Sequence, residues 1–315
     1  MKKVFSLILA LGLIASLTAC GGGNASGNET GDSAPAASTA KLRFVTGGES
    51  GTYYAFGSVI AQHATNNTDV SVTGLVGNGS KSNVEELADG NAELAFCQSD
   101  VMAYAYNGTN LFENPIDCFS TVAALYMEDV QIVTTDPSIK TVADLAGKNV
   151  SVGAAGSGVY FNAVDILSAY GLGDLDADGK FTKINATYQS FGDSADSLKD
   201  GKIDAAFIVA GAPTTAITEL ATSGMDFSLV SLDQEHVDAL HEKYPFLVQE
   251  NLPAGTYEGV DTETICVAVE AALVASTDMS EDAVYELTKT MFENLEELGT
   301  SHAKFQLVSA EKAAE

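Results

Sequence analysis

The chain of 315 residues is poor in positive charge and has a single arginine, Arg43. It has 15 lysine and arginine residues against 43 aspartate and glutamate residues, which gives a formal net charge of −28 at pH 7. A surface this negative repels phosphate backbones, so we expect no nucleic-acid partner. Because a bidentate fork for a carboxylate needs a guanidinium, any such fork in this protein has to use Arg43.

The sequence also lacks the short motifs of common cofactor and catalytic sites. No GxGxxG or GxxxxGK[ST] loop is present, which argues against a dinucleotide or ATP site. No GxSxG elbow or HExxH motif is present, which argues against α/β-hydrolases and zinc proteases. The four cysteines have no CxxC spacing, so we expect no metal site and no cofactor. The pairing of Cys97, Cys118 and Cys266 is left open.

Long apolar runs are absent except at the N-terminus. A short basic head precedes Val4–Leu17, a nearly unbroken apolar stretch of 14 residues. This stretch is too short to span about 30 Å of hydrocarbon, but it is typical of a signal-peptide core. Leu17–Gly21 then resembles a bacterial lipobox. We expect residues 1–19 to be a lipoprotein signal peptide and Cys20 to be lipidated; the alternative is an ordinary secretory signal with a chance cysteine.

The segment that follows, residues 20–41, is rich in glycine, serine, alanine and asparagine and is predicted to be a flexible tether. No later segment is apolar for 18 residues, so no further membrane span is expected. Together these features predict a protein held by a lipid anchor on the extracytoplasmic face of the cell membrane, at the cell surface or in the periplasm.

An internal repeat organises the rest of the chain. Ser50-Gly51-x-Tyr53, after a predicted strand, recurs as Ser157-Gly158-x-Tyr160 at an offset of 107 residues. The segment 84–96, which reads as a helix, a glycine stop and a buried strand, recurs at 195–207 at an offset of 111. Each half therefore reads strand, glycine-rich loop, helix, strand, helix, strand, which predicts two α/β units with mostly parallel strands.

The repeat also predicts a ligand site. Open α/β sheets bind ligands beyond the carboxyl ends of their strands, where the loops at 50–52 and 157–158 open helices. Helix starts offer unpaired N–H groups and a positive dipole end, which suit a carboxylate. Alternatively, the serines are only N-caps. The strand ends at 98–100 and 210–213 form a second matched pair, for which ordinary strand-to-helix turns are the alternative.

These residues resemble the TAXI-type solute receptors of tripartite ATP-independent periplasmic (TRAP) transporters. The resemblance extends over about residues 42–302. It is carried by 46–48 with 50–54, 90–96 with 98–100, 124–126, 142–148 with 152–153, 156–158, 201–205 with 209–213, and 253–257. The GTYY and QSD elements in this order are its most specific parts.

The resemblance implies an α/β fold of the type II periplasmic-binding-protein kind, with two α/β lobes around a central ligand cleft. From the repeat order we expect residues 42–131 plus 263–315 to form lobe I and 132–262 to form lobe II. The ligand-binding residues that the resemblance implies are Thr46, Glu49, Ser50, Gly51, Thr52, Tyr53, Tyr54, Gln98, Ser99, Asp100, Ser157, Gly158 and Gly211. Sister receptors clamp a carboxylate with an arginine, but Arg43 begins a strand, so no such clamp is expected.

We therefore predict a lipid-anchored, monomeric solute-binding receptor that is not an enzyme. It would capture glutamate, glutamine or a related dicarboxylate and deliver it to the membrane subunits of a TRAP-type permease. Glu49 or Asp100 would meet an ammonium group, which would favour an amino acid. Two alternatives stay open: a ligand-sensing surface lipoprotein without transport, and a secreted α/β transferase with Ser50 or Ser157 as nucleophile, although neither serine has a base near it in the sequence.

Overall fold

The computed structural model describes residues 40–314. Cys20, the predicted signal peptide and nearly all of the predicted tether lie outside the described residues, so the predictions about them stay predictions. Among the residues that are described, no helix is both long and apolar enough to cross a membrane. Cys97 and Cys266 are buried, Cys118 is half-buried, and all three are free thiols.

Ten strands form one mixed sheet in the order β2-β1-β3-β10-β4-β7-β5-β6, with β8 on β4 and β9 on β10. The first repeat, residues 40–107, supplies the parallel strands β1 (Ala40–Val45), β2 (Val70–Leu75) and β3 (Leu94–Gln98). The second repeat, residues 149–222, supplies β5 (Asn149–Ser151), β6 (Asn185–Thr187) and β7 (Ala205–Ala210), also parallel. The order β2-β1-β3 thus corresponds to β6-β5-β7.

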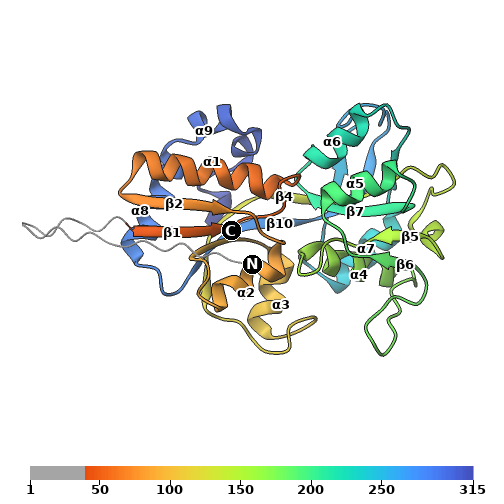
Figure 1. Ribbon diagram of the computed structural model, residues 1–315, viewed down its shortest axis with the longest axis horizontal. Coiled ribbons are helices and arrows are strands. Elements are labelled where there is room, and N and C mark those ends of the chain that lie inside the picture. The colour runs from red at the N-terminus through yellow and green to blue at the C-terminus, as the bar shows by residue number, and fades with distance from the viewer. Residues whose placement is uncertain (1–39, 315) are drawn as a thin grey trace, which may run out of the picture. The chain divides into compact units, whose positions relative to one another are not determined.

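Each repeat alternates its strands with helices (Figure 1). The first has α1 (Thr52–Asn67), α2 (Ser80–Ala88) and α3 (Ser99–Asn107), and the second has α4 (Gly158–Ala169), α5 (Phe191–Lys199) and α6 (Thr215–Thr222). Gly90 and Gly201, which follow α2 and α5, have φ angles of +68° and +66°. Glycine adopts this left-handed conformation without a steric penalty, so both helices end where the repeat predicted a stop.

Two long antiparallel strands, β4 (Phe119–Thr134) and β10 (Thr264–Ser276), join the repeats at the middle of the sheet. The other edge of β10 pairs with β3, and the other edge of β4 pairs with β7 (Figure 1). The remaining elements are η1 (Val142–Leu145), β8 (Ser228–Leu229), α7 (Gln234–Lys243), β9 (Val248–Leu252), α8 (Glu281–Glu293), α9 (Leu295–Ser301), η2 (Ala303–Leu307) and η3 (Lys312–Ala314).

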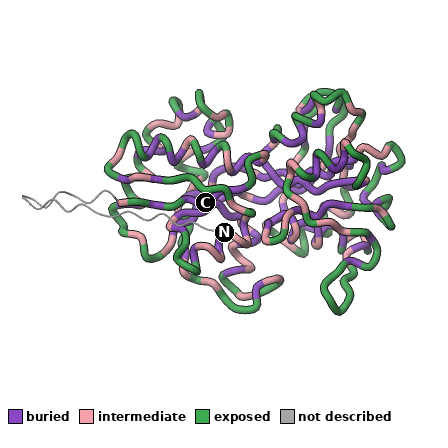
Figure 2. The backbone as a smooth tube through the Cα atoms, viewed as in Figure 1, coloured by how far each residue is buried: buried purple, intermediate pink, exposed green. Residues whose placement is uncertain are grey.

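Buried residues follow the strands of both repeats (Figure 2). One cluster joins Phe44, Phe56 and Phe96 of the first repeat to Met291 and Phe305 near the C-terminus. The chain therefore returns to the first repeat after β10.

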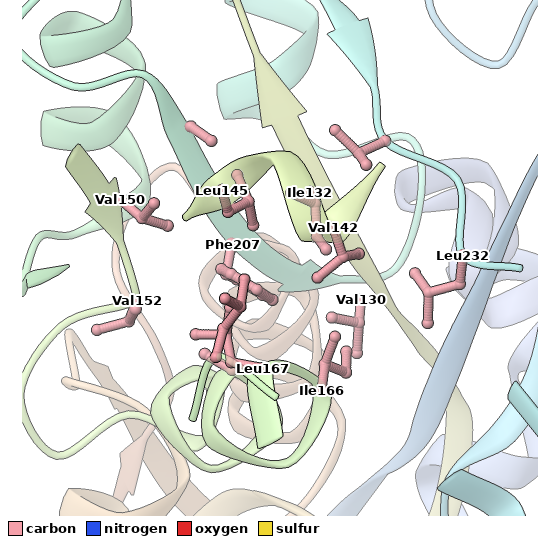
Figure 3. Packing of buried hydrophobic residues seen from close by; sticks show 14 of the residues in the cluster. Val130, Ile132, Val142, Leu145, Val150, Val152, Ile166, Leu167, Phe207 and Leu232 are labelled. Carbon is pink, nitrogen blue, oxygen red and sulfur yellow. The ribbon is translucent and has the colours of Figure 1, made fainter. Parts of the chain in front are cut away.

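A second apolar cluster packs the strands and helices of the second repeat together. Val150, Ile166 and Phe207 pack there with Ile132 of β4, and Leu232 lies on the same cluster (Figure 3). These cores hold the loops at the strand ends in place.

Candidate functional site

A cavity of about 330 Å³ is lined by residues of both repeats. Its walls are the loops that follow β1, β2, β5 and β6, together with the ends of β3 and β7 and the middle of β4. All of the loops lie beyond the carboxyl ends of parallel strands, which is where α/β sheets bind ligands.

Four helices begin at this cavity, two from each repeat. The N-cap residues of α1, α2, α4 and α5 are Gly51, Gly79, Ser157 and Ser190, and all four line it. Only the side chain of Ser190 caps its own helix, by accepting a hydrogen bond from the Asp193 N–H. Because the first N–H groups of a helix lack intrahelical partners and carry the positive end of its dipole, these walls favour an anionic group.

Glycines allow the helix starts of the two repeats to approach each other closely. A Cβ added to Gly158 would lie 1.6 Å from Oε1 of Gln98, and one added to Gly79 would lie 3.1 Å from Cα of Ser157. Gly79 also has a φ of +106°, a conformation that L side chains rarely adopt. A larger residue at either position would therefore need its neighbour in the other repeat to move.

Direct hydrogen bonds connect the repeats around the cavity. The Thr52 hydroxyl donates to the Gly211 carbonyl at 3.1 Å. Nε2 of Gln98 donates to Oδ1 of Asn162 at 2.7 Å, and Nδ2 of Asn162 donates to Oδ2 of Asp100 at 2.8 Å. The two repeats are therefore in direct contact beside the cavity, as expected of a closed arrangement.

Three polar groups that line the cavity have no hydrogen-bond partner. They are Oε1 of Glu128, the Tyr53 hydroxyl and the Ser157 hydroxyl. Glu128, on β4, is only 3% exposed. Burial raises the pKa of the Glu128 carboxyl to about 8, with the nearby Tyr53 hydroxyl and the Lys304 ammonium acting in the opposite direction. Buried polar groups are normally paired, so three orphans in one cavity indicate a place for a polar ligand.

Eight of the thirteen predicted site residues line the cavity: Glu49, Ser50, Gly51, Thr52, Tyr53, Gln98, Ser157 and Gly158. Glu49 is exposed, whereas Gln98 and Ser157 are buried. Ser50 is not an N-cap, because that position belongs to Gly51. Ser157 is an N-cap by position, but its hydroxyl makes no capping bond.

The other five predicted residues are not among those that line the cavity. The Thr46 hydroxyl donates to the Leu75 carbonyl, the Ser99 hydroxyl accepts from the Glu270 N–H, and the buried Asp100 accepts from Asn162. Tyr54 is half-buried on α1, and Gly211 follows the lining residue Ala210. Arg43 pairs with Glu93, and among the described residues that line the cavity there is neither a lysine nor an arginine.

Sequence reasoning missed three parts of the wall: the loop 76–80, the turn 190–192 and Glu128. The offset of 111 residues pairs Ser80 with Phe191, so it contains the signal for a second pair of helix starts. The signal for Glu128 is weaker. It is an acidic residue inside the otherwise largely apolar run that forms β4.

Known proteins share this fold. A profile of the NMT1-like family matches residues 44–315. A structure described as a periplasmic transporter is 14% identical with a TM-score of 0.57, over 84% of this chain and 87% of that one. An ancestral arginine-binding protein bound to arginine is 13% identical with a TM-score of 0.53, over 86% and 98%. The alkanesulfonate-binding protein SsuA from Xanthomonas axonopodis pv. citri, bound to MOPS, is 15% identical with a TM-score of 0.52, over 86% and 80%.

At these identities the likeness concerns the fold, and it confirms the predicted two-lobed α/β fold of type II periplasmic binding proteins. The duplicated strand order and the cavity between the repeats are parts of that fold. Since the family profile matches residues 44–315, which is nearly the whole described chain, the protein belongs to the NMT1-like family.

Proposed function

We propose that this protein is an extracytoplasmic receptor that binds a small organic solute through a carboxylate and has no catalytic role. The observation that carries the proposal is the convergence of four helix starts on one cavity that also holds the unpartnered Ser157 hydroxyl. The volume of about 330 Å³ lies near the lower end of small-ligand pockets, which run from roughly 300 to 1,000 Å³. A ligand the size of glutamate, glutamine or a related dicarboxylate fits this scale.

The transferase alternative finds little support in the surroundings of the two serines. A nucleophilic serine needs a base within hydrogen-bond reach. The Ser157 hydroxyl has no partner, and no histidine is among the described residues that line the cavity. The four histidines make other contacts: His63 with Asn67 and Thr290, His236 with Asp233, His241 with the Leu247 carbonyl, and His302 with the Lys304 N–H.

The lobe division expected from the sequence is retained as part of the proposal, with residues 42–131 plus 263–315 as lobe I and 132–262 as lobe II. It is supported by the apolar cluster that joins the first repeat to the C-terminal helices, and by the two strands that link the repeats. A ligand that contacts the helix starts of both repeats stabilises the closed form, because only that form offers both sets of contacts.

The transport partner is proposed from the sequence motifs, which resemble those of TAXI-type receptors for TRAP permeases. Membrane attachment is proposed through Cys20, which lies outside the described residues. Replacing Cys20 by serine should move the protein from the detergent phase to the aqueous phase in detergent partitioning. A variant that stays with the detergent would argue against this anchor.

The carboxylate site is tested by calorimetry. Native mass spectrometry of the purified protein first identifies any ligand that is carried through. L-glutamate, L-glutamine and 2-oxoglutarate are then titrated into the wild type, Thr52→Val and Ser157→Ala. Loss of one hydrogen bond to a charged group costs roughly 1.5–3 kcal/mol, so we expect a ten- to hundredfold weaker affinity in Ser157→Ala. Thr52→Val removes the bond from the Thr52 hydroxyl to the Gly211 carbonyl and should weaken binding by disfavouring the closed form. Ser58→Ala is the control, because Ser58 is exposed and bonds only within α1. Unchanged affinity in both cavity variants would refute the site.

A further inference from the structure

Glu128 is a buried carboxyl within the cavity that the fold itself does not explain. It is 3% exposed, it lines the cavity, and Oε1 has no hydrogen-bond partner. Stability alone would favour an apolar residue here, since leaving a buried carboxyl unsatisfied costs free energy. The unpartnered Tyr53 hydroxyl lines the same cavity. Oε1 of Glu128 is therefore a buried oxygen of the cavity wall that has no partner within the chain.

The charges on the cavity wall indicate which ligand group belongs beside Glu128. Glu128 and the exposed Glu49 are the charged residues among the described lining, so the side chains supply no positive charge. The helix starts attract an anion, whereas Glu128 repels one when it is ionised. A ligand that carries a carboxylate and an ammonium group satisfies both parts of the wall. An ammonium group has three donors and no acceptor, which matches Oε1 of Glu128 once the carboxyl is ionised.

We propose that Glu128 receives the ammonium group of the ligand and thereby selects an amino acid over the 2-oxo acid or dicarboxylate of the same length. This inference rests on the proposed function, because it takes the carboxylate site at the helix starts as given. It replaces Glu49 and Asp100 as the candidates for the ammonium contact. Glu49 is exposed to solvent, and Asp100 is already bonded to Asn162 outside the cavity lining.

Several groups of the chain face Glu128 and influence the pKa of its carboxyl. They are Tyr53 from α1, Tyr126 and Asp129 from β4, Lys304 from η2 and the backbone N–H of Gly211 after β7. The β10 residue opposite Glu128 is the apolar Val269. Burial raises the pKa of the Glu128 carboxyl by more than the Tyr53 hydroxyl and the Lys304 ammonium lower it. The pKa in the empty cavity is therefore about 8.

At pH 7 the carboxyl of the empty protein is therefore mostly protonated. An arriving ammonium group requires the ionised form, so the O–H bond of Glu128 breaks and its proton goes to the solvent. The affinity for an amino acid should then rise with pH by up to about tenfold per unit between pH 6 and 8 and level off above. The affinity for a 2-oxo acid should not rise in this way.

The test compares two ligand classes on matched variants. L-glutamate, L-glutamine and L-aspartate are titrated alongside 2-oxoglutarate, oxaloacetate and glutarate into the wild type, Glu128→Gln and Asp165→Asn. Asp165 is also a buried carboxyl, but it lies outside the cavity lining. We expect Glu128→Gln to lower the ratio of amino-acid to 2-oxo-acid affinity by roughly ten- to a hundredfold, the effect of losing one charged hydrogen bond. Asp165→Asn should leave this ratio unchanged.

A second readout needs no variant. Calorimetry of the wild type at pH 7 in phosphate and in Tris, whose ionisation enthalpies differ, counts the protons released. We expect a release approaching one proton for an amino acid and none for a 2-oxo acid. A bound amino acid that releases no proton overturns the inference even if Glu128→Gln does not fold.

The failure of this inference can be distinguished from failure of the carboxylate site. An unchanged affinity ratio in Glu128→Gln, or tighter binding of the 2-oxo acid to the wild type, overturns the role of Glu128 while the carboxylate site stands. If neither class binds and no carried ligand with a carboxylate is found, the proposed function fails together with the inference.

Discussion

Asp100 is a carboxyl buried where the two repeats meet. It is fully buried, Oδ2 accepts from Asn162, and Oδ1 has no partner. Burial raises the pKa of this carboxyl to about 7. The folded chain therefore holds a proton on Asp100 more tightly than the unfolded chain does, and stability is lost as the pH rises through 7.

We expect Asp100→Asn to flatten this pH dependence, because the variant has no proton to lose. Between pH 5.5 and 8.5 the free energy of unfolding of the variant should fall by roughly 1–3 kcal/mol less than that of the wild type. Urea unfolding at several pH values measures the difference. Asp117→Asn is the control, since Asp117 is exposed. Parallel curves for Asp100→Asn and the wild type would contradict the prediction.

Two glycines of the cavity wall form a matched pair for a packing test. A methyl group at Gly158 would meet Oε1 of Gln98 at 1.6 Å, whereas one at Gly48 would have no neighbour within 4 Å. Gln98 is buried and bonded to Asn162, so it cannot move away freely. We expect Gly158→Ala to lower the free energy of unfolding by roughly 1–3 kcal/mol, the usual cost of overpacking. Gly48→Ala should leave it within about 0.5 kcal/mol. Equal melting temperatures for the two variants would show that Gln98 gives way.

At the residue scale, the sequence predicted part of the cavity wall. The rest could not be predicted for a physical reason. Ser157 and Thr52 follow strands in a repeated pattern, which is a local signal. Glu128 is a candidate site residue only because β10, β7 and α1 surround it. No local sequence pattern predicts such burial. Ser99 and Asp100 carry the same polar signal as Gln98, yet they start α3 and bond to β10 and to Asn162 instead.

The serine N-caps around the cavity differ in what their side chains do: one stabilises its helix, whereas the other is free to bind a ligand. The Ser190 hydroxyl bonds the N–H and the carboxylate of Asp193, and so caps α5. The Ser157 hydroxyl makes no such bond at α4. We expect Ser190→Ala to lower the free energy of unfolding by about 1 kcal/mol, and Ser157→Ala to change it by much less. Thermal unfolding without ligand checks this difference. A larger loss in Ser157→Ala would mean that its hydroxyl supports the fold.

The elements themselves followed from the sequence where they repeat. Strands and helices of the two repeats correspond in the predicted order, and α2 and β3 precede α5 and β7 by the predicted 111 residues, since the signals of these elements are apolar runs and glycine stops. The pairing of β4 with β10 joins segments about 140 residues apart, and one-dimensional periodicity contains no information about such partners. The second pair of helix starts, at α2 and α5, follows the same offset of 111 residues.

For the whole molecule, fully buried acids and half-buried acids in ion pairs act in opposite directions on stability. Burial raises the pKa of Asp100 to about 7, of Glu128 to about 8 and of Asp165 to about 6. These groups remove stability as the pH rises from about 4 towards 8. By contrast, the Arg43 side chain lowers the pKa of Glu93, and Lys148 lowers that of Asp136. Those two groups contribute stability that is lost as the pH falls below about 4.

The ligand-free protein should therefore melt at the highest temperature near pH 4 and at progressively lower temperatures towards pH 8. Scanning calorimetry across pH 4 to 9 measures this profile. A melting temperature that climbs from pH 6 to 8 would contradict the assignment of raised pKa values to the three buried acids. Adding an amino acid that binds should reduce the decline at pH 8, because the ligand favours the ionised form of Glu128.

The continuous sheet through β10 and β4 limits how the two repeats can move apart. Their ladder runs from Ala268 opposite Asp129 to Ser276 opposite Phe119, and it is flanked on both sides by further strands. Opening must bend or twist these two strands without breaking their pairing. Deuterium should therefore enter the amides of the ladder slowly with or without ligand, since only global unfolding exposes them. The amides at the starts of α1 and α4 should exchange faster when the cavity is empty. Deuterium uptake at these amides would therefore locate the site by the mobility of its rim, independently of the chemistry of the ligand.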